Sequence, residues 1–487
     1  MQWMSRSLVR FFAGWTSSLR SVSGSNLPRF GRSISGSDLP RFGRSMSGSD
    51  LSQARRSMSG SDLPRFGRSM SGSVELRVSP ERCLFDDPLR LEVIGLIPGQ
   101  EVSLRTELTD EGGEPFTSLG RYRAGSGGDL ELSRSPALEG GTFTGVEAEG
   151  PLWALEPRNG MRRMVKKDVR SPLTVRFSLH QEPAGDVLST AVQERSFLGE
   201  GVSRIPVREG RVRATLFIPP GPGPFPGVIE IQGTGGGLLE YKASLLASRG
   251  FATMALAYYN YEDLPKDMKA FHLEYFEEAV NYMLQHPKIK GPGIGLLGHS
   301  KGGDLVISMA SFLKGITATA VVNGSVANVA ADLHYKDITL PAIGYDPKKA
   351  TFPQPGFIDI GDVFNNPLEE PNRQSLIPVW RADCKFLFIV GEDDRNWKSD
   401  FYAQTACKLL EEHGKEKPEV VYYPKAGHYI EPPYYPLCKA FIHKLVGLPC
   451  VWGGEPKEHS FAQVDSWQRI QAFFHKHLIQ ERPSSKL

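Results

Sequence analysis

The chain has 487 residues, 40% of them hydrophobic and 23% charged, which is the composition of a globular protein longer than one ordinary domain. Its apolar runs, such as residues 386–390, fall well short of the roughly 18 residues that span a bilayer, so we expect no membrane span. The net charge of +2 is unevenly divided, because residues 1–73 hold eleven Arg, no Lys and three Asp and leave −6 for the rest. That rest has no Lys/Arg stripe with interleaved aromatic residues, which argues against a nucleic-acid partner.

Residues 1–73 contain a twelve-residue repeat, with copies that begin at Ser21, Ser33, Ser45 and Ser57. The repeat is rich in Ser, Gly and Arg and has few apolar side chains to bury, so we predict that residues 1–73 are a disordered extension. Residues 1–20 also carry apolar side chains at helical spacing, basic residues on other faces and no acid. That pattern is typical of a mitochondrial transit peptide.

The opposite end, residues 481–487, is a short tail that closes with Ser485, Lys486 and Leu487, an address that the peroxisomal import receptor reads. A transit-like composition arises easily, whereas a specific tripeptide at the carboxyl end is rarer by chance. We therefore predict the peroxisome, with the mitochondrial matrix or the cytosol as alternatives. The five cysteines lack CxxC spacing and a partnering His cluster, which predicts free thiols in a reducing compartment.

Residues 74–204 show the two-residue alternation of half-buried strands, most clearly at residues 102–108 and 173–179. Short strands separated by turns predict a β-sandwich domain, with an immunoglobulin-like topology as the hypothesis. Residues 205–480 instead alternate short apolar runs with helical stretches, which predicts an α/β domain with a mostly parallel sheet and helices on both faces. The expected strands are residues 227–231, 252–257, 294–297, 318–322, 386–390 and 420–423, and the expected helices are residues 239–248, 271–284, 302–313 and 401–413.

Gly298-His299-Ser300-Lys301-Gly302 lies between the expected strand at 294–297 and the helix that follows it. A nucleophilic serine at such a turn needs a small residue two places away on either side, because the turn is strained and tightly packed. The pentapeptide alone is weak evidence in a chain with 51 Gly, but its place between a strand and a helix predicts that Ser300 is a nucleophile. His299 beside it is interpreted as a packing residue.

A serine hydroxyl needs an imidazole to take its proton and a carboxylate to hold that imidazole. In chain order the acid and then the histidine should follow the serine. The acids Glu392, Asp393 and Asp394 follow one late strand, and His428 follows the next. His428 is therefore the candidate base, and the spacing leaves the choice among the three acids open.

The oxyanion formed by attack on a carbonyl needs two backbone N–H donors. One is expected from Lys301, directly after the nucleophile, and the other from the glycine-rich segment 233–237, where Gly235 is the candidate. A phosphate-binding loop is the rival interpretation of this segment. It lacks the Gly-Lys-Ser/Thr ending of a P-loop, and its G-x-G-x-x-G pattern fails at Leu238, so the oxyanion role is favoured.

Longer motifs are similar to those of the type-I acyl-CoA thioesterase and bile acid-CoA:amino acid N-acyltransferase family. They occur at residues 152–157, 233–241, 257–265, 300–303, 323–325, 396–399 and 427–433. The resemblance implies a β-sandwich domain before an α/β-hydrolase domain, and a triad of Ser300, Asp394 and His428. It also implies a fatty acyl-CoA substrate. The transferases carry Cys at the nucleophile position, so Ser300 favours water as the acceptor, while His299 stands where the thioesterases have an apolar residue.

Residues and resemblance together predict the hydrolysis of fatty acyl-CoA to free fatty acid and CoA through an acyl-serine intermediate. The triad supplies nucleophile, base and charge stabilisation, so no metal and no cofactor is expected. One alternative is acyl transfer to an amine such as glycine or taurine. Two others are a catalytically silent acyl-CoA-binding protein and a carboxylesterase that prefers oxygen esters.

Overall fold

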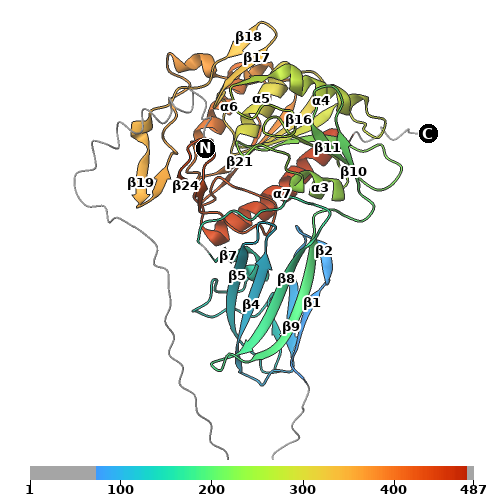
Figure 1. Ribbon diagram of the computed structural model, residues 1–487, viewed down its shortest axis with the longest axis vertical. Helices are drawn as coiled ribbons and strands as arrows, with labels where there is room; N and C mark the ends of the chain where they lie inside the picture. Colours follow the sequence, from blue (N-terminus) through green and yellow to red (C-terminus); the bar gives the residue numbers. More distant parts are fainter. Residues whose placement is uncertain (1–72, 159, 480–487) are drawn as a thin grey trace, which may run out of the picture.

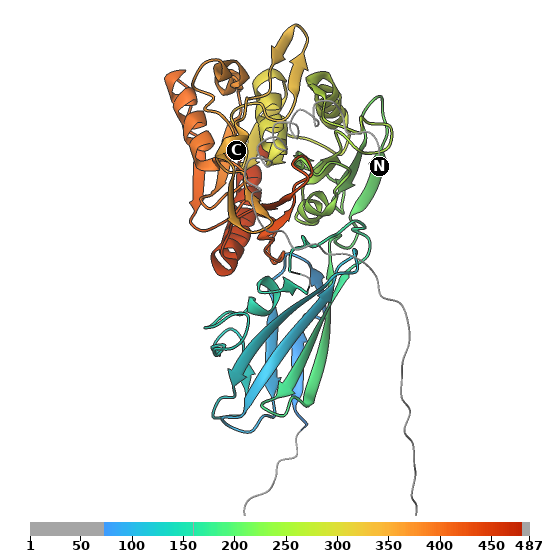
Figure 2. The same ribbon diagram turned by 60° about the vertical axis from the view of Figure 1, so that its left-hand side comes forward.

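The structure, a computed structural model, describes residues 73–158 and 160–479. The predicted disordered extension, apart from Ser73, the transit-like segment and the carboxyl-terminal tripeptide lie outside the described residues. The described residues form a β-rich region and an α/β region stacked end to end (Figures 1 and 2). None of their helices is long and apolar enough to cross a membrane.

The first region is a sandwich of two sheets. Its strand orders are β1-β3-β6 and β2-β9-β8-β4-β5-β7. In β8, Val175, Phe177 and Leu179 are fully buried and alternate with more exposed residues, which is the alternation that predicted a sandwich, and this prediction is confirmed. The elements are β1 (Glu75–Ser79), β2 (Arg82–Leu84), β3 (Arg90–Ile94), β4 (Glu101–Thr109), β5 (Pro115–Arg123), β6 (Leu130–Glu131), α2 (Gly150–Trp153), β7 (Glu156–Pro157), β8 (Leu173–Gln181) and β9 (Val187–Ser196).

The second region is built on an eight-stranded sheet of order β10-β11-β13-β12-β15-β16-β21-β22. The strands from β13 to β22 are parallel, and β10 and β11 add an antiparallel edge. Strands β12, β13 and β15 are buried at every position, as expected of a sheet covered on both faces. The strands are β10 (Ser203–Val207), β11 (Ala214–Ile218), β12 (Gly227–Ile231), β13 (Ala252–Leu256), β15 (Ile294–His299), β16 (Ile316–Val322), β21 (Lys385–Gly391) and β22 (Glu419–Tyr423).

Helices cover both faces of this sheet, which confirms the predicted α/β-hydrolase architecture (Figure 1). Helices α3 and α7 share one buried cluster with the sandwich and lie on the face toward it, while α4, α5 and α6 pack on the opposite face. The helices are α3 (Tyr241–Ser248), α4 (Leu273–Gln285), α5 (Lys301–Phe312), α6 (Ser399–Glu412) and α7 (Pro456–Leu478), with short 3₁₀ helices η1 (Pro347–Lys349), η2 (Asn372–Ser375) and η3 (Val379–Arg381).

Two small sheets were not predicted, and one of them shortens an expected helix. The helix expected at 271–284 begins at Leu273, because residues 270–272 pair with β17 as a short strand. The segment between β16 and β21 supplies most of the strands in these sheets. Their orders are β14-β17-β18 and β19-β20-β24-β23. The strands are β14 (Ala270–His272), β17 (Asp332–Tyr335), β18 (Ile338–Leu340), β19 (Thr351–Gln354), β20 (Phe357–Asp359), β23 (Ala440–Ile442) and β24 (Pro449–Val451).

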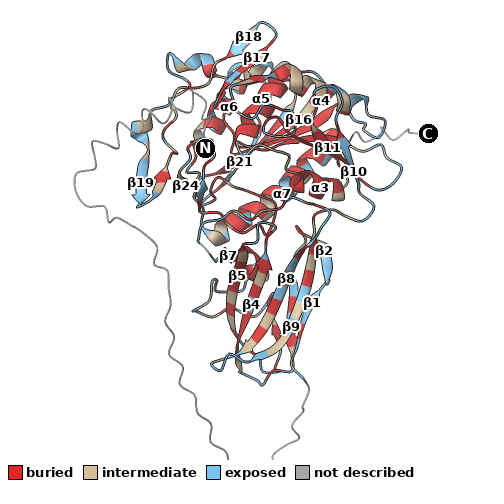
Figure 3. Cartoon of the chain, in the orientation of Figure 1, coloured by how far each residue is buried: buried red, intermediate tan, exposed pale blue. Residues whose placement is uncertain are grey.

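The two regions share one continuous hydrophobic cluster rather than a thin contact. Figure 3 shows buried residues along the strands of the sandwich and along α3 and α7. Phe85 of the sandwich stacks on Phe197 and also contacts Tyr435. The indole of Trp467 on α7 donates to Asp86 at 2.8 Å. The boundary predicted at 204/205 falls within β10, which pairs with β11 of the large sheet, so we propose that the second domain begins just before β10.

The buried strand β12 carries a carboxylate, Glu230, which is 1% exposed. Neither of its carboxylate oxygens has a hydrogen-bond partner among the described residues. Burial raises the pKa of Glu230 to about 8, and the charge of Lys242 only partly opposes this. Glu230 is therefore protonated in the folded protein at pH 7.

Replacing Glu230 by Gln tests this assignment through stability. In the unfolded wild-type chain the Glu230 carboxyl ionises above its usual pKa of 4.5, whereas in the folded protein it keeps its proton up to about pH 8. The free energy of unfolding of wild type therefore decreases as the pH rises from 4.5 to about 8. Glu230→Gln cannot ionise and so lacks this decrease. Relative to pH 5, its free energy of unfolding is expected to exceed that of wild type by on the order of 3 kcal/mol at pH 8. Denaturant titrations at several pH values measure it. An equal difference at pH 5 and pH 8 would contradict the assignment, and the exposed Glu92→Gln serves as control.

Candidate active site

Ser300 occupies the turn between β15 and α5 with φ +58°, a conformation that non-glycine residues rarely adopt. The flanking glycines are required by packing. A Cβ on Gly302 would lie 2.1 Å from the carbonyl oxygen of Ile231, and one on Gly298 would lie 2.3 Å from that of Gly302. The Ser300 N–H donates to Val322 of the neighbouring strand at 3.0 Å, which ties the turn to the sheet.

The structure brings Ser300, His428 and Asp394 together. Nε2 of His428 lies 2.8 Å from Ser300 Oγ, and Nδ1 lies 2.8 Å from Asp394 Oδ2. Ser300 and His428 are buried, and the side chain of Asp394 is only 2% exposed. They follow β15, β22 and β21 in turn, so that the carboxyl ends of parallel strands in one sheet supply the whole constellation.

Among the three candidate acids, Asp394 is the one in contact with His428. The hydroxyl of Ser399 donates to Asp394 Oδ2 at 2.6 Å, and the N–H of Asn396 donates to Oδ1 at 2.8 Å. Asp393 instead accepts hydrogen bonds from Arg395 at 2.7 Å and from the N–H of Gly454 at 2.8 Å. These bonds orient Asp394 toward the imidazole and engage Asp393 elsewhere.

Asn323, directly after β16, connects the loops that carry the acid and the base. Its amide nitrogen donates to the carbonyl oxygens of Gly427 and His428 at 3.1 and 2.8 Å. Its amide oxygen accepts the N–H of Gly391 at 2.8 Å. The sequence motif at residues 323–325 contributed only to the family resemblance, and no role was predicted for Asn323. The signal that could have found it was a polar residue directly after β16, the strand between those that precede Ser300 and Asp394.

His299 is more than the packing residue that was predicted. Its Nε2 lies 2.9 Å from the carbonyl oxygen of His428 and must carry a proton, since a carbonyl only accepts. Burial, with the charge of Lys242, lowers the pKa of His299 well below its usual value, which keeps the ring neutral. His299 and Asn323 thus hold the same carbonyl group.

The side chain of Lys301 is fully buried beneath the turn. Its Nζ donates to Asp304 at 2.9 Å and to Asn328 at 3.1 Å and lies 4.6 Å from the centre of the Phe271 ring. This anchoring fixes the first turn of α5, whose amino end points its N–H groups toward the nucleophile.

In the glycine-rich segment, Gly233 is packed against Ser300. A Cβ on Gly233 would meet Ser300 Cβ at 2.8 Å and Oγ at 3.1 Å, whereas one on Gly235 would meet nothing within 4 Å. The hydroxyl of Tyr258 donates to the Gly233 carbonyl at 2.9 Å, and Lys444 Nζ donates to the Gly235 carbonyl at 2.8 Å. These bonds hold the segment beside Ser300. Its close contact with Ser300 is at Gly233, whereas Gly235 was the predicted donor.

A largely apolar cavity of about 180 Å³ adjoins this constellation. Its lining joins Thr234, next to Gly233, with Trp397, whose ring meets His428 edge-on at 5.5 Å. Val329, Ile343, Phe364 and Val446 supply apolar side chains to the same lining. Within residues 73–158 and 160–479, no group of three or more His, Cys, Asp or Glu side chains is placed to hold a metal ion. The apolar cavity and the contact between Ser300 and His428 suit the site to attack by a serine on a carbonyl that bears an apolar substituent.

Asn323→Gly removes the amide while keeping a residue that adopts the positive φ of +44° without strain. With the two loops no longer tied, the rate constant for labelling of Ser300 by a fluorophosphonate is expected to fall about 10- to 100-fold. Mass spectrometry of the labelled peptide measures it. Asn366→Gly, in a surface turn, is the control. Labelling at the wild-type rate would show that Asn323 does not hold the triad together.

Two stretches of the chain match families of known proteins. Residues 86–209 match the family described as "Acyl-CoA thioester hydrolase/BAAT N-terminal region", and residues 271–480 match "BAAT / Acyl-CoA thioester hydrolase C terminal". Over 400 residues the chain is 59% identical to acyl-coenzyme A thioesterase 2, mitochondrial, of Homo sapiens, across 82% of this chain and 83% of that protein. It is equally identical over 400 residues to acyl-coenzyme A thioesterase 1 of Homo sapiens, across 82% of this chain and 95% of that protein.

Among solved structures, a putative dienelactone hydrolase from Klebsiella pneumoniae aligns over 57% of this chain and 98% of its own, with 16% identity and a TM-score of 0.35. The sequence relationships are much stronger, since they extend through both domains at more than half identity. This protein belongs to the acyl-CoA thioester hydrolase/BAAT family.

Proposed function

We propose that this protein hydrolyses fatty acyl-CoA to free fatty acid and CoA, with Ser300 as nucleophile, His428 as base and Asp394 as the acid that orients it. The observation that carries the proposal is the pair of 2.8 Å contacts that His428 makes to Ser300 and Asp394. Family membership supports the substrate class, because both human relatives are named acyl-coenzyme A thioesterases.

In the proposed reaction, His428 Nε2 takes the Ser300 proton as Oγ attacks the thioester carbonyl. The N–H of Lys301 and one from the segment 233–235 stabilise the oxyanion. The C–S bond then breaks, and the CoA sulfur leaves with the proton from His428. A water gives a proton to His428 and attacks the acyl-serine, which releases the fatty acid and returns the proton to Oγ, while Asp394 steadies the imidazolium throughout.

The apolar cavity is proposed to hold the first part of the acyl chain. It begins beside Thr234 and Trp397, where the carbonyl carbon would stand next to Ser300, and it is lined by aliphatic and aromatic side chains further in. Such a lining gains free energy from each methylene that it removes from water. The hydrolase assignment is preferred over amine transfer because a serine, rather than a cysteine, occupies the nucleophile position.

The peroxisomal import receptor is proposed as a partner through Ser485, Lys486 and Leu487. The mitochondrial name of one human relative and the transit-like residues 1–20 support the competing compartment. Imaging with either terminus masked decides between the two.

Ser300→Ala is expected to lower kcat for a long-chain acyl-CoA by about 10³-fold or more, because only binding and the oxyanion donors remain. Release of free CoA, followed with a thiol reagent, measures it. Because water and taurine as acceptors would both release CoA, mass spectrometry of the acyl product with taurine present separates them. Conjugate in place of free acid would refute hydrolysis, and wild-type turnover by Ser300→Ala would refute the triad.

A larger residue in the cavity is expected to change chain-length preference. Ala342 is half-buried and lines the cavity, so Ala342→Trp fills space that long chains need. We expect kcat/KM for long-chain acyl-CoA to fall about 10- to 100-fold, with a much smaller effect on short chains. Lys348→Trp, an exposed position on the same segment, is the control. A uniform loss across chain lengths would place the acyl chain elsewhere.

A further inference from the structure

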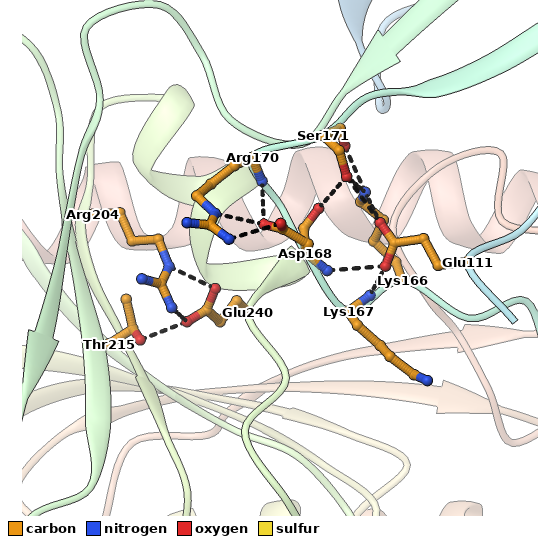
Figure 4. A network of polar contacts seen from close by, with 9 residues as sticks. All are labelled: Glu111, Lys166, Lys167, Asp168, Arg170, Ser171, Arg204, Thr215 and Glu240. Carbon is orange, nitrogen blue, oxygen red and sulfur yellow. Dashed lines mark hydrogen bonds and ion pairs between the residues drawn. The ribbon is translucent and has the colours of Figure 1, made fainter.

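The segment between β7 and β8 belongs to the sandwich and contacts the α/β-hydrolase domain, and the β4–β5 turn of the sandwich holds it in place (Figure 4). Asp110 accepts the N–H of Val165 at 2.8 Å. Glu111 accepts the N–H groups of Lys167 and Asp168 at 2.5 and 2.9 Å and forms an ion pair with the buried Lys166. The backbone of this segment is thus fixed by carboxylates that belong to the first domain.

From this segment Arg163 reaches into the second domain. Its Nη2 donates to the hydroxyl of Tyr241 at 2.8 Å and forms an ion pair with Glu431, and its guanidinium lies 4.6 Å from the centre of the Tyr429 ring. The Tyr241 hydroxyl donates to Glu431 at 2.9 Å, and Lys242 Nζ lies 3.0 Å from the same carboxylate. The Glu431 side chain is only 4% exposed, so these partners, rather than water, stabilise its charge.

Tyr429 and Glu431 lie one and three residues after the proposed base, His428. The start of this loop is held within the second domain, because Asn323 and His299 both donate to the His428 carbonyl at 2.8 and 2.9 Å. Three residues later, the loop is held by Arg163 from the first domain. The His428 main chain therefore lies between an anchor within the second domain and Glu431, which Arg163 of the first domain and Tyr241 and Lys242 of the second hold together.

We propose that Arg163 is a positioning residue for the reaction: through Glu431 it holds the His428 loop so that the imidazole meets Ser300. The sandwich then contributes a side chain that the active site needs. This inference rests on the proposed role of the triad, but not on the identity of the acyl substrate. The competing interpretation is that Arg163 only adds an ion pair between domains, which would affect stability and leave the chemistry unchanged.

The test uses the full-length chain with Arg163→Gln, Arg163→Lys, Glu431→Gln and the double variant Arg163→Gln/Glu431→Gln. Arg162→Gln is the matched control, since Arg162 is the exposed neighbour on the same segment. Three quantities are measured: the fluorophosphonate labelling rate of Ser300, kcat and KM for a long-chain acyl-CoA, and the thermal midpoint.

Arg163→Gln is expected to lower both the labelling rate and kcat about 10- to 100-fold, because a small displacement of a catalytic group has effects of that size. KM should change by less than about threefold, since no substrate contact is removed. Arg163→Lys should restore part of the rate, and the double variant should be no slower than the slower single variant, because Arg163 is proposed to act through Glu431. Arg162→Gln should behave as wild type.

Several results would overturn the inference. A lower thermal midpoint with an unchanged labelling rate would leave Arg163 a purely structural residue, and losses that multiply in the double variant would show that it does not act through Glu431. If Arg163→Gln does not fold, Glu431→Gln decides, because it keeps the shape of the side chain, and labelling at the wild-type rate would refute the proposal. Wild-type labelling at Ser300 without acyl-CoA hydrolysis would reject the proposed function alone.

Discussion

The hydrogen bonds of Asn323 are the constraint on which the rest of the site depends. Ser300, Asp394 and His428 stand on loops after separate strands, and two hydrogen bonds through His428 connect their side chains. The distances of 2.8 Å between them must therefore be set by groups that take no part in proton transfer. Asn323 meets this need, since it stands after the central strand β16 and binds the backbone of both neighbouring loops. Its amide fixes separation without adding a charge or a titratable group beside the imidazole.

The supporting buried ion pairs, in contrast, lie behind the proposed reacting groups and do not include them. Lys301 and Asp304 are paired beneath the nucleophile, and burial raises the pKa of Asp304 to about 6. Glu431 lies between Arg163 and Lys242 behind His428. Buried pairs of this kind add little to stability against hydrophobic substitutes, so their presence around one site points to geometry as their contribution. Each pair fixes a backbone segment that carries a reacting group.

Much of the framework was predictable because it follows local rules. The strands β12, β15 and β21 are mostly apolar and almost wholly buried, and Ser300 and the three candidate acids follow two of them in the expected order. The small sheets were missed because their strands are three or four residues long, and β19 is exposed at every position, so no periodic pattern marks them. The contact between Arg163 and Glu431 joins residues 268 apart, and no local pattern encodes such a pairing. His299 was misread because its partner is a backbone carbonyl, which sequence does not display.

The two domains are coupled by their shared hydrophobic core as well as by the ion pair between Arg163 and Glu431. Helices α3 and α7 bury apolar side chains in the same cluster as the sandwich, so an isolated second domain would expose them to water. Tyr241 is the first residue of α3, and its hydroxyl binds both Arg163 and Glu431. The apolar contact thus fixes the helix that presents the polar partner, and the polar partner fixes the His428 loop. Packing between the domains and orientation of the base are two results of the same interface.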